Sequence, residues 1–274
     1  MTADAELMRL ELENQIAVAR AFLSPGTELA QRYGTAVEQV VGLACSRCEV
    51  WDYQLFNRAI GAAVLGPLDA GGIARIVRHY ATYGRGACVE VYDGVTPPDL
   101  LAALASTGFT DSGHGYESHV LEIDHPIAVS IAGATVRRCE PVEYRRFGEL
   151  VRDGFGFGDG GAVGAFIADL TVSGLETMGS NGAAFIASFD GEDAGTGELV
   201  LTDRVAGCYS GTVGERFRGR GIQKALIAAR IRDGLARGRR IFISQTDPDS
   251  PSGHNLHDLG FRTLYRATWF TRPA

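Results

Sequence analysis

Arginines and glycines are concentrated in one short stretch, Glu215-Arg216-Phe217-Arg218-Gly219-Arg220-Gly221, between a strand-like run and a helix-like run. The first N–H groups of a helix have no partner within the helix, and they carry roughly half a positive charge. Glycines at this position let a ligand approach the backbone closely. Arginine side chains add further positive charge. The stretch therefore predicts a binding site for a diphosphate group.

The spacing of these residues excludes two common phosphate-binding motifs. A P-loop has four residues between its glycines and ends in Gly-Lys-Ser/Thr, and a dinucleotide fingerprint reads Gly-x-Gly-x-x-Gly. The pattern here is Arg216-x-x-Gly219-x-Gly221, preceded by Thr212-Val213 and followed by Ile222. It resembles the acyl-CoA loop of the GNAT superfamily of N-acyltransferases. The alternative is an ordinary strand-to-helix turn with solvated arginines, and the flanking strand and helix patterns favour the loop.

The resemblance implies acetyl-CoA or another acyl-CoA as co-substrate, without a metal. In the family, pantetheine lies along the strand before the loop, here residues 209–213, and hydrogen-bonds to its backbone like an added strand. The amides of residues 218–222 would bind the diphosphate, and an N–H near Val213 would face the thioester carbonyl. The cofactor-binding residues implied in this part of the chain are Thr212, Val213, Arg216, Arg218, Gly219, Arg220, Gly221 and Ile222.

A second segment, residues 251–261, resembles the last helix of the family, in which an Asn or Ser often contacts pantetheine. Asn255 is the candidate for that contact, and Ser252 could assist. Both residue types also cap helices by accepting hydrogen bonds from the first N–H groups. Helix capping is therefore the alternative role for both residues.

Acyl transfer to an amine needs a held thioester, a deprotonated amine and a donor for the thioester oxygen. Many family members have a tyrosine five residues before the Phe of a Gly-Phe pair, and this tyrosine protonates the leaving thiolate. In this sequence the position is Leu256. The strand-like run 205–213 contains no carboxylate. The remaining acid–base candidates are Tyr209, Glu198, Asp203, His254 and His257.

His254 is the first choice among these candidates, because a histidine titrates near neutral pH and can accept an ammonium proton. Tyr209 is the second catalytic candidate. For each of them the alternative is a solvated or structurally satisfied polar residue without a catalytic role.

Bulk composition limits the possible partners. The chain has 274 residues, net charge −7 and a pI near 5.4, which argues against general binding to nucleic acid or anionic membranes. No run of about 18 apolar residues is present, and the first residues are acidic rather than basic and apolar. We expect a cytoplasmic protein. Lys224 is the one lysine among 26 basic residues, which indicates a genome composition bias of a bacterial kind.

The five cysteines are scattered and odd in number, which fits a reducing compartment better than a disulfide framework. Cys45 and Cys48 have C-x-x-C spacing, but no second pair or nearby histidine completes a zinc site. We expect two buried thiols on a strand.

Apolar periodicity predicts alternating helices and strands. A glycine-rich break at 156–161 could serve as a substrate lid. Helices are expected at 6–23 (stopped by Pro25-Gly26), after Asp69, after Pro98, and at 141–155, 162–171, 222–236 and 253–259. Strands are expected at 35–48, 52–65, 88–92, 115–123, 134–138, 183–190, 197–202, 205–213, 241–244 and 262–270, with 183–213 forming an antiparallel meander.

The order helix, strand, helix, Gly-Phe and Tyr-bearing strand occurs at 68–123 and again at 222–270. Such internal similarity indicates a duplicated fold. The resemblance then implies an α/β (α+β) protein of two GNAT-like folds in tandem, each a mixed, mostly antiparallel sheet flanked by helices. The expected ranges are 1–125, a degenerate copy whose residues 61–68 lack Arg-x-x-Gly-x-Gly, and 132–274, which carries the acyl-CoA loop.

The predicted function is transfer of an acetyl or other acyl group from acyl-CoA to a primary amine of a small molecule. Two alternatives remain open: an acyl carrier protein as the donor, whose phosphopantetheine would use the same strand, or a non-catalytic acyl-CoA-binding regulator. The sequence identifies neither the amine, nor the acyl group, nor the oligomeric state.

Overall fold

The computed structural model describes residues 3–23, 27–158 and 161–274. The chain divides into two compact units, Met1–Ser118 with Leu264–Ala274, and His119–Thr263. The first unit therefore combines both ends of the sequence, and the ranges 1–125 and 132–274 remain predictions about the duplicated copies. The predicted helix stop at Pro25-Gly26, and residues 159 and 160 of the glycine-rich break, lie outside the described residues.

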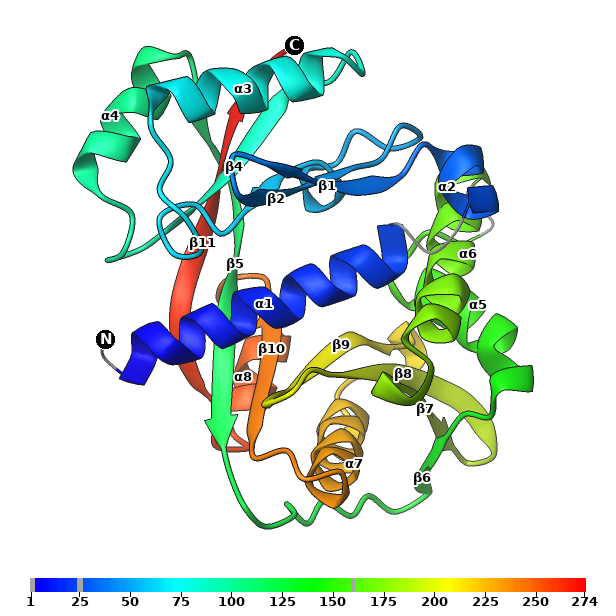
Figure 1. Cartoon of the computed structure of the whole chain (residues 1–274). Helices are drawn as coiled ribbons and strands as arrows, with labels where there is room; N and C mark the ends of the chain where they lie inside the picture. Colours follow the sequence, from blue (N-terminus) through cyan, green and yellow to red (C-terminus); the bar gives the residue numbers. More distant parts are fainter. Residues whose placement is uncertain (1–2, 24–26, 159–160) are drawn as a thin grey trace. The chain divides into compact units, whose positions relative to one another are not determined.

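The first unit contains a sheet in the order β1-β2-β3-β4-β11, with the first part of β5 beside β11. Its core includes the fully buried side chains of Tyr80, Ile73 and Val89. Its elements, labelled in Figure 1, are α1 (Ala3–Leu23), α2 (Thr27–Tyr33), β1 (Ala36–Val40), β2 (Leu43–Arg47), β3 (Ala59–Ile60), α3 (Ala70–Ala81), β4 (Ala87–Tyr92), α4 (Pro98–Ser106), β5 (Thr110–Glu122) and β11 (Arg262–Arg272).

The region from 35 to 65 differs from the sequence prediction. The expected strand at 35–48 is a hairpin of β1 and β2, with Val41 (φ 51°) and Gly42 (φ 83°) as its two turn residues. The expected strand at 52–65 is reduced to β3, because Asn57 organises the preceding segment as a loop. Its side chain accepts from the Cys48 N–H at 2.8 Å and donates to the carbonyls of Trp51 and Tyr53. Cys45 and Cys48 are buried free thiols, as predicted.

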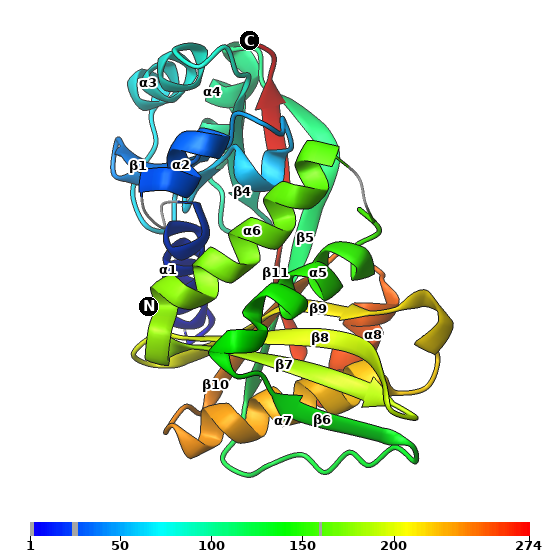
Figure 2. The ribbon, with the colours of Figure 1, turned by 90° about the vertical axis from the view of Figure 1, so that its right-hand side faces the viewer.

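The second unit contains a sheet in the order β10-β9-β8-β7-β6, with the end of β5 beside β10. Helices α5 and α6 cover one face of this sheet, and α7 covers the other (Figure 2). Its elements are β6 (Ala134–Arg138), α5 (Tyr144–Gly154), α6 (Gly161–Met178), β7 (Gly182–Phe189), β8 (Glu192–Leu201), β9 (Val205–Val213), α7 (Ile222–Ala236), β10 (Ile241–Thr246) and α8 (Pro251–His257).

The meander β7-β8-β9 forms as predicted, with antiparallel pairing throughout. Its first turn is tight, since Asp190 (φ 49°) and Gly191 (φ 85°) both adopt the left-handed conformation.

Within the described residues, no helix is long and apolar enough to cross a membrane.

The core of the second unit lies between this sheet and α7. Leu226 and Phe242 are fully buried there, and Gly234 lets α7 approach the sheet closely. A Cβ atom at Gly234 would lie only 2.5 Å from Phe242 Cε1. Close packing of α7 on the sheet therefore fixes where the helix begins, which matters for the site described below.

Leu226→Ala should lower the free energy of unfolding by about 2–5 kcal/mol, because the change removes buried apolar surface and leaves a cavity. Urea titration followed by circular dichroism measures the change. The exposed Val142→Ala, at 89% side-chain exposure in the native protein, serves as the control and should change stability by less than about 0.5 kcal/mol. A similar effect of both substitutions would contradict the assigned core.

Candidate functional site

Strands β9 and β10 run parallel only over their first halves. Their register runs from Val205 with Ile241 to Cys208 with Ser244, where the Ser244 hydroxyl donates to the Cys208 carbonyl at 3.0 Å. Strand β9 continues to Val213, paired with β8 on its other side. The two strands diverge from this point (Figure 1). A diverging strand edge presents backbone groups to which an extended, amide-containing ligand can bind as an added strand.

A β-bulge lies where β9 leaves β10. The pairing of β8 with β9 shifts between Thr196 and Glu198, and Ser210 has φ 48°. A non-glycine residue in this conformation is strained unless its surroundings hold it. Here the Ser210 hydroxyl donates to Glu198 Oε2 at 2.8 Å, and the Thr196 hydroxyl donates to the Ser210 carbonyl at 2.9 Å. The bulge bends β9, and these two bonds stabilise the bend.

The predicted phosphate loop connects β9 to α7. A 3-10 turn at Glu215–Phe217 is followed by Gly219 (φ 75°) and Gly221 (φ 79°), and α7 begins at Ile222. Within the described chain, no backbone acceptor is found for the N–H groups of Gly219, Arg220 and Gly221. Together with the first N–H groups of α7, these donors form the environment that an anion needs at a helix N-terminus.

The three loop arginines point in different directions. Arg216 forms an ion pair with Glu192 and lies over the Phe217 ring, so it is turned towards the β7-β8 end of the sheet. Arg218 Nε donates to the Val213 carbonyl at 3.3 Å, and the Arg220 guanidinium lies 4.9 Å from the Phe189 ring centroid. Arg216, Arg218 and Arg220 are all exposed beside the loop, and phosphate contact by each of them remains a prediction.

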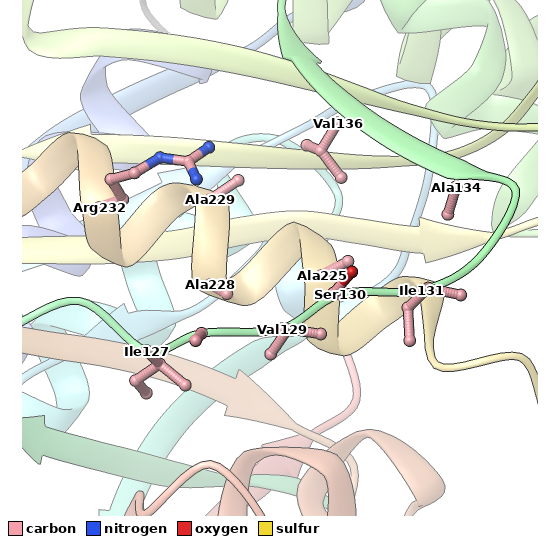
Figure 3. Close-up of a pocket in the computed structure, with 11 residues that line it drawn as sticks. Ile127, Val129, Ser130, Ile131, Ala134, Val136, Ala225, Ala228, Ala229 and Arg232 are labelled. Carbon is pink, nitrogen blue, oxygen red and sulfur yellow. The ribbon is translucent and has the colours of Figure 1, made fainter.

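A cavity of about 400 Å³ lies along the outer side of α7, next to this loop (Figure 3). The side chains that line it are aliphatic apart from Ser130 and Arg232. The neighbouring segment 127–131 does affect the loop. A Cβ atom at Gly221 would lie 2.8 Å from Ile131 Cδ1, the end of a flexible side chain, so glycine is favoured there chiefly by its φ of 79°.

Ser252 and Asn255 are joined by a residue that the sequence prediction did not include. Gln223, the second residue of α7, donates to the Ser252 hydroxyl at 2.6 Å and accepts from the Asn255 amide at 2.7 Å. The cap of α8 is instead Ser250, which accepts from the Gly253 N–H. Ser252 and Asn255 are therefore free of the capping role, and they lie beside the start of α7. Cofactor contact by these two residues remains a prediction.

The acid–base candidates fall into two groups. Glu198 is fully buried on β8, and burial raises its pKa to about 8, although the Ser210 hydrogen bond and the charge of Arg230 oppose this shift. Its cross-strand partner is Tyr209, which places both side chains on the same face of the sheet. His254 and His257 are exposed on α8, and Asp203 is exposed in the β8-β9 turn. Burial of Glu198 depends on long-range packing, so the sequence held no signal for it.

The corresponding position in the first unit is closed. Strands β3 and β4 are parallel, but the Gly61 N–H, just beyond β3, donates to the Tyr92 hydroxyl at 2.8 Å. The chain then turns back, with the Leu65 N–H bonded to the Gly61 carbonyl at 2.8 Å. Side chains of the unit itself thus occupy the space beside β3.

Several solved structures are similar to this chain, among them the following three. The first is a GCN5-related N-acetyltransferase from Kribbella flavida, 16% identical, with a TM-score of 0.63 over 94% of this chain and 95% of that protein. A tandem GNAT protein from the clavulanic acid biosynthesis pathway gives 16% identity, a TM-score of 0.63 and coverage of 95% and 94%. A GCN5-related N-acetyltransferase from Sphaerobacter thermophilus is 19% identical, with a TM-score of 0.59 and coverage of 74% and 65%.

No protein-family model and no curated relative matches the sequence. At these identities the structural likeness shows the fold alone. The chain has the fold of tandem GNAT proteins, which confirms the predicted fold class.

The raised pKa of Glu198 makes stability depend on pH. The folded protein keeps this proton up to about pH 8, whereas an unfolded chain releases it near pH 4.5. Between these values the folded state binds more protons, so the free energy of unfolding falls as pH rises. Glu198→Gln removes this loss and should stabilise the protein, relative to the native chain, by a few kcal/mol more at pH 8 than at pH 5, at about 1.4 kcal/mol per pKa unit.

Urea titrations of both proteins at both pH values measure this difference. The exposed Glu176→Gln on α6 is the control and should have the same small effect at each pH. An equal effect of Glu198→Gln at pH 5 and pH 8 would contradict the raised pKa.

Proposed function

We propose that this protein is an N-acyltransferase that moves an acetyl or other acyl group from acyl-CoA to a primary amine of a small molecule. One observation carries the proposal: the diverging edge of β9 leads directly into the start of α7, where the N–H groups of residues 219–221 have no backbone acceptor among the residues that the structure describes. An acyl-CoA has an amide-containing arm followed by a diphosphate, in the same order. The GNAT fold of the chain supports this reading.

The β9 edge and the loop would hold the donor. The backbone of Thr212 and Val213 would bind the pantetheine arm, and an N–H near Val213 would face the thioester oxygen, where charge develops during transfer. The N–H groups from Gly219 to Ile222 would bind the diphosphate. Gln223, with Ser252 and Asn255, would line the side of the same channel.

Proton transfer needs a group that can take a proton from the attacking ammonium. We assign this role to Glu198, since its pKa of about 8 lies close to neutral pH, where acid–base catalysis is efficient. Ser210, which is only partly buried and bonded to Glu198, would pass the proton inward. Tyr209, on the same face, would protonate the leaving thiolate. His254, the first choice from the sequence, is the competing proton acceptor.

Gly219→Glu should weaken binding of acetyl-CoA at least about tenfold, equivalent to 1.4 kcal/mol, because a carboxylate there repels the diphosphate. A side chain at this position meets no atom within 4 Å, so the substitution tests charge and backbone conformation rather than packing. Isothermal titration with acetyl-CoA and with CoA measures the affinity.

The matched control is Gly238→Glu, just beyond the other end of α7. Gly238 has φ 78°, close to the 75° of Gly219, and a Cβ atom there also meets nothing within 4 Å. Its affinity should equal that of the native protein. If the native protein binds no acyl-CoA, a carrier-protein donor becomes the better explanation; equal losses in both variants would remove the loop from the site.

Glu198→Gln should lower kcat/KM by roughly 100-fold or more in an assay of thiol release with a panel of amines, since acid–base catalysis contributes about that much. His254→Ala should have little effect, and Tyr209→Phe should mainly lower kcat. A large loss in His254→Ala with full activity in Glu198→Gln would reverse the assignment. Tight CoA binding without turnover of any amine would instead indicate a regulator.

A further inference from the structure

Arg230 is a buried arginine in the middle of α7, with 2% of its surface exposed. Among the described residues, no carboxylate forms an ion pair with it. Its guanidinium instead donates to three backbone carbonyls: Nε to Leu226 at 3.1 Å, and Nη1 to Tyr209 at 3.2 Å and Glu198 at 3.5 Å. Burial lowers the pKa of Arg230. A buried charge is costly, so its placement against these carbonyls needs a reason.

Gly197 makes room for this guanidinium on the α7 face of the sheet, and Gly211 lies beside it at ordinary contact distance. A Cβ atom at Gly197 of β8 would lie 2.9 Å from Arg230 Nε, and one at Gly211 of β9 would lie 3.6 Å from Nη2. Both glycines flank the β-bulge, where the register of β8 and β9 shifts. The guanidinium thus lies directly under the bend, on the face opposite to the Glu198 and Ser210 side chains.

We propose that Arg230 is a positioning residue. It stabilises the bend of β9 from the α7 face of the sheet, and it thereby fixes the exposed edge of β9 that would bind the acyl donor. The inference rests on the proposed function, because it concerns the same edge. On the face opposite to α7, the hydrogen bonds of Ser210 with Glu198 and Thr196 stabilise the bulge. On the α7 face, Arg230 donates hydrogen bonds to the carbonyls of Glu198 and Tyr209, the paired residues at which the bend begins. The guanidinium bonds to the Leu226 carbonyl through Nε and to both bend carbonyls through Nη1, whereas a lysine has a single nitrogen, which cannot occupy both of these positions.

The charge of Arg230 has a second, separable effect. It favours the ionised form of Glu198, whereas burial favours the protonated form. On the Glu198 face of the sheet, Ser210 of β9 is bonded to the carboxyl, Tyr209 of β9 lies opposite it, and Tyr144 of α5 interacts at longer range; Arg230 of α7 acts through its charge from the other face. Loss of the Arg230 charge should therefore raise the pKa of Glu198, so that its carboxyl ionises and can accept a proton only at a higher pH.

The test compares Arg230→Met, Arg230→Lys and Gly197→Ala with the control Arg232→Met, an exposed arginine two residues further along α7. Acetyl-CoA affinity is measured by isothermal titration, and kcat/KM is measured from pH 6 to pH 10. Arg230→Met should weaken binding about tenfold and shift the acidic limb of the pH profile upward by about half a unit or more. Arg230→Lys keeps the charge, so it should weaken binding while leaving the limb near its native position.

Gly197→Ala displaces the guanidinium without removing it. Like Arg230→Lys, it should weaken the binding of acetyl-CoA. This variant also keeps the proposal testable if Arg230→Met fails to fold. Arg232→Met should behave like the native protein. Native affinity in both Arg230→Lys and Gly197→Ala would overturn the inference alone, whereas failure of the native protein to bind acetyl-CoA would overturn the proposed function and the inference together. A loss of activity in Arg230→Met that is equal at every pH would contradict the effect of the Arg230 charge on Glu198.

Discussion

The bend in β9 at Ser210 is the constraint on which the candidate site depends. Up to Cys208 the strand is an ordinary member of a parallel pair, and without the bend it would continue beside β10 and satisfy its own edge. The left-handed conformation of Ser210 turns the strand away, and this leaves backbone groups for a ligand. The same bend determines where β9 ends and therefore where the glycine loop and α7 begin. One strained residue thus positions both parts of the proposed donor site.

The first unit shows what happens without this arrangement. It has a similar succession of strand, loop, helix and strand, but Gly61 is bonded to a tyrosine of the neighbouring strand, and the loop folds back through Leu65. Its loop also lacks arginines and the paired glycines of residues 219 and 221. The edge beside β3 is therefore occupied by groups of the unit itself rather than open to an extended ligand. The unit keeps its stability, because a satisfied edge costs nothing in desolvation.

The sequence predicted the features that depend on local signals. Glycine spacing and apolar periodicity predicted the loop from Arg216 to Gly221, the helix from Ile222 to Ala236 and the order of the meander. Its middle strand, expected at 197–202, begins earlier, at Glu192, because the preceding turn is confined to Asp190 and Gly191. The features that it missed depend on contacts distant in sequence. A left-handed serine carries no glycine signal, Gln223 resembles any helix residue, and the burial of Glu198 and Arg230 arises only when β8, β9 and α7 pack together. The hairpin at Val41-Gly42 was missed for a different reason, because valine rarely occupies such a turn.

Two buried glutamates in this chain show how a structural carboxylate differs from one suited to exchange a proton. Glu90, in the first unit, lies 2.5 Å from Arg58 Nε and accepts hydrogen bonds from the hydroxyls of Tyr92 and Tyr116, so its charge is compensated. Glu198 accepts a hydrogen bond from the Ser210 hydroxyl, while the N–H groups of the nearby Arg230 donate to backbone carbonyls instead of to the carboxylate. A fold selected for stability alone would pair this carboxylate or replace it with an apolar residue. In the described part of the chain, Glu198 has neither a paired arginine nor a second donor, and burial raises its pKa to about 8, so this carboxyl at the bend is better suited than Glu90 to exchange a proton near neutral pH.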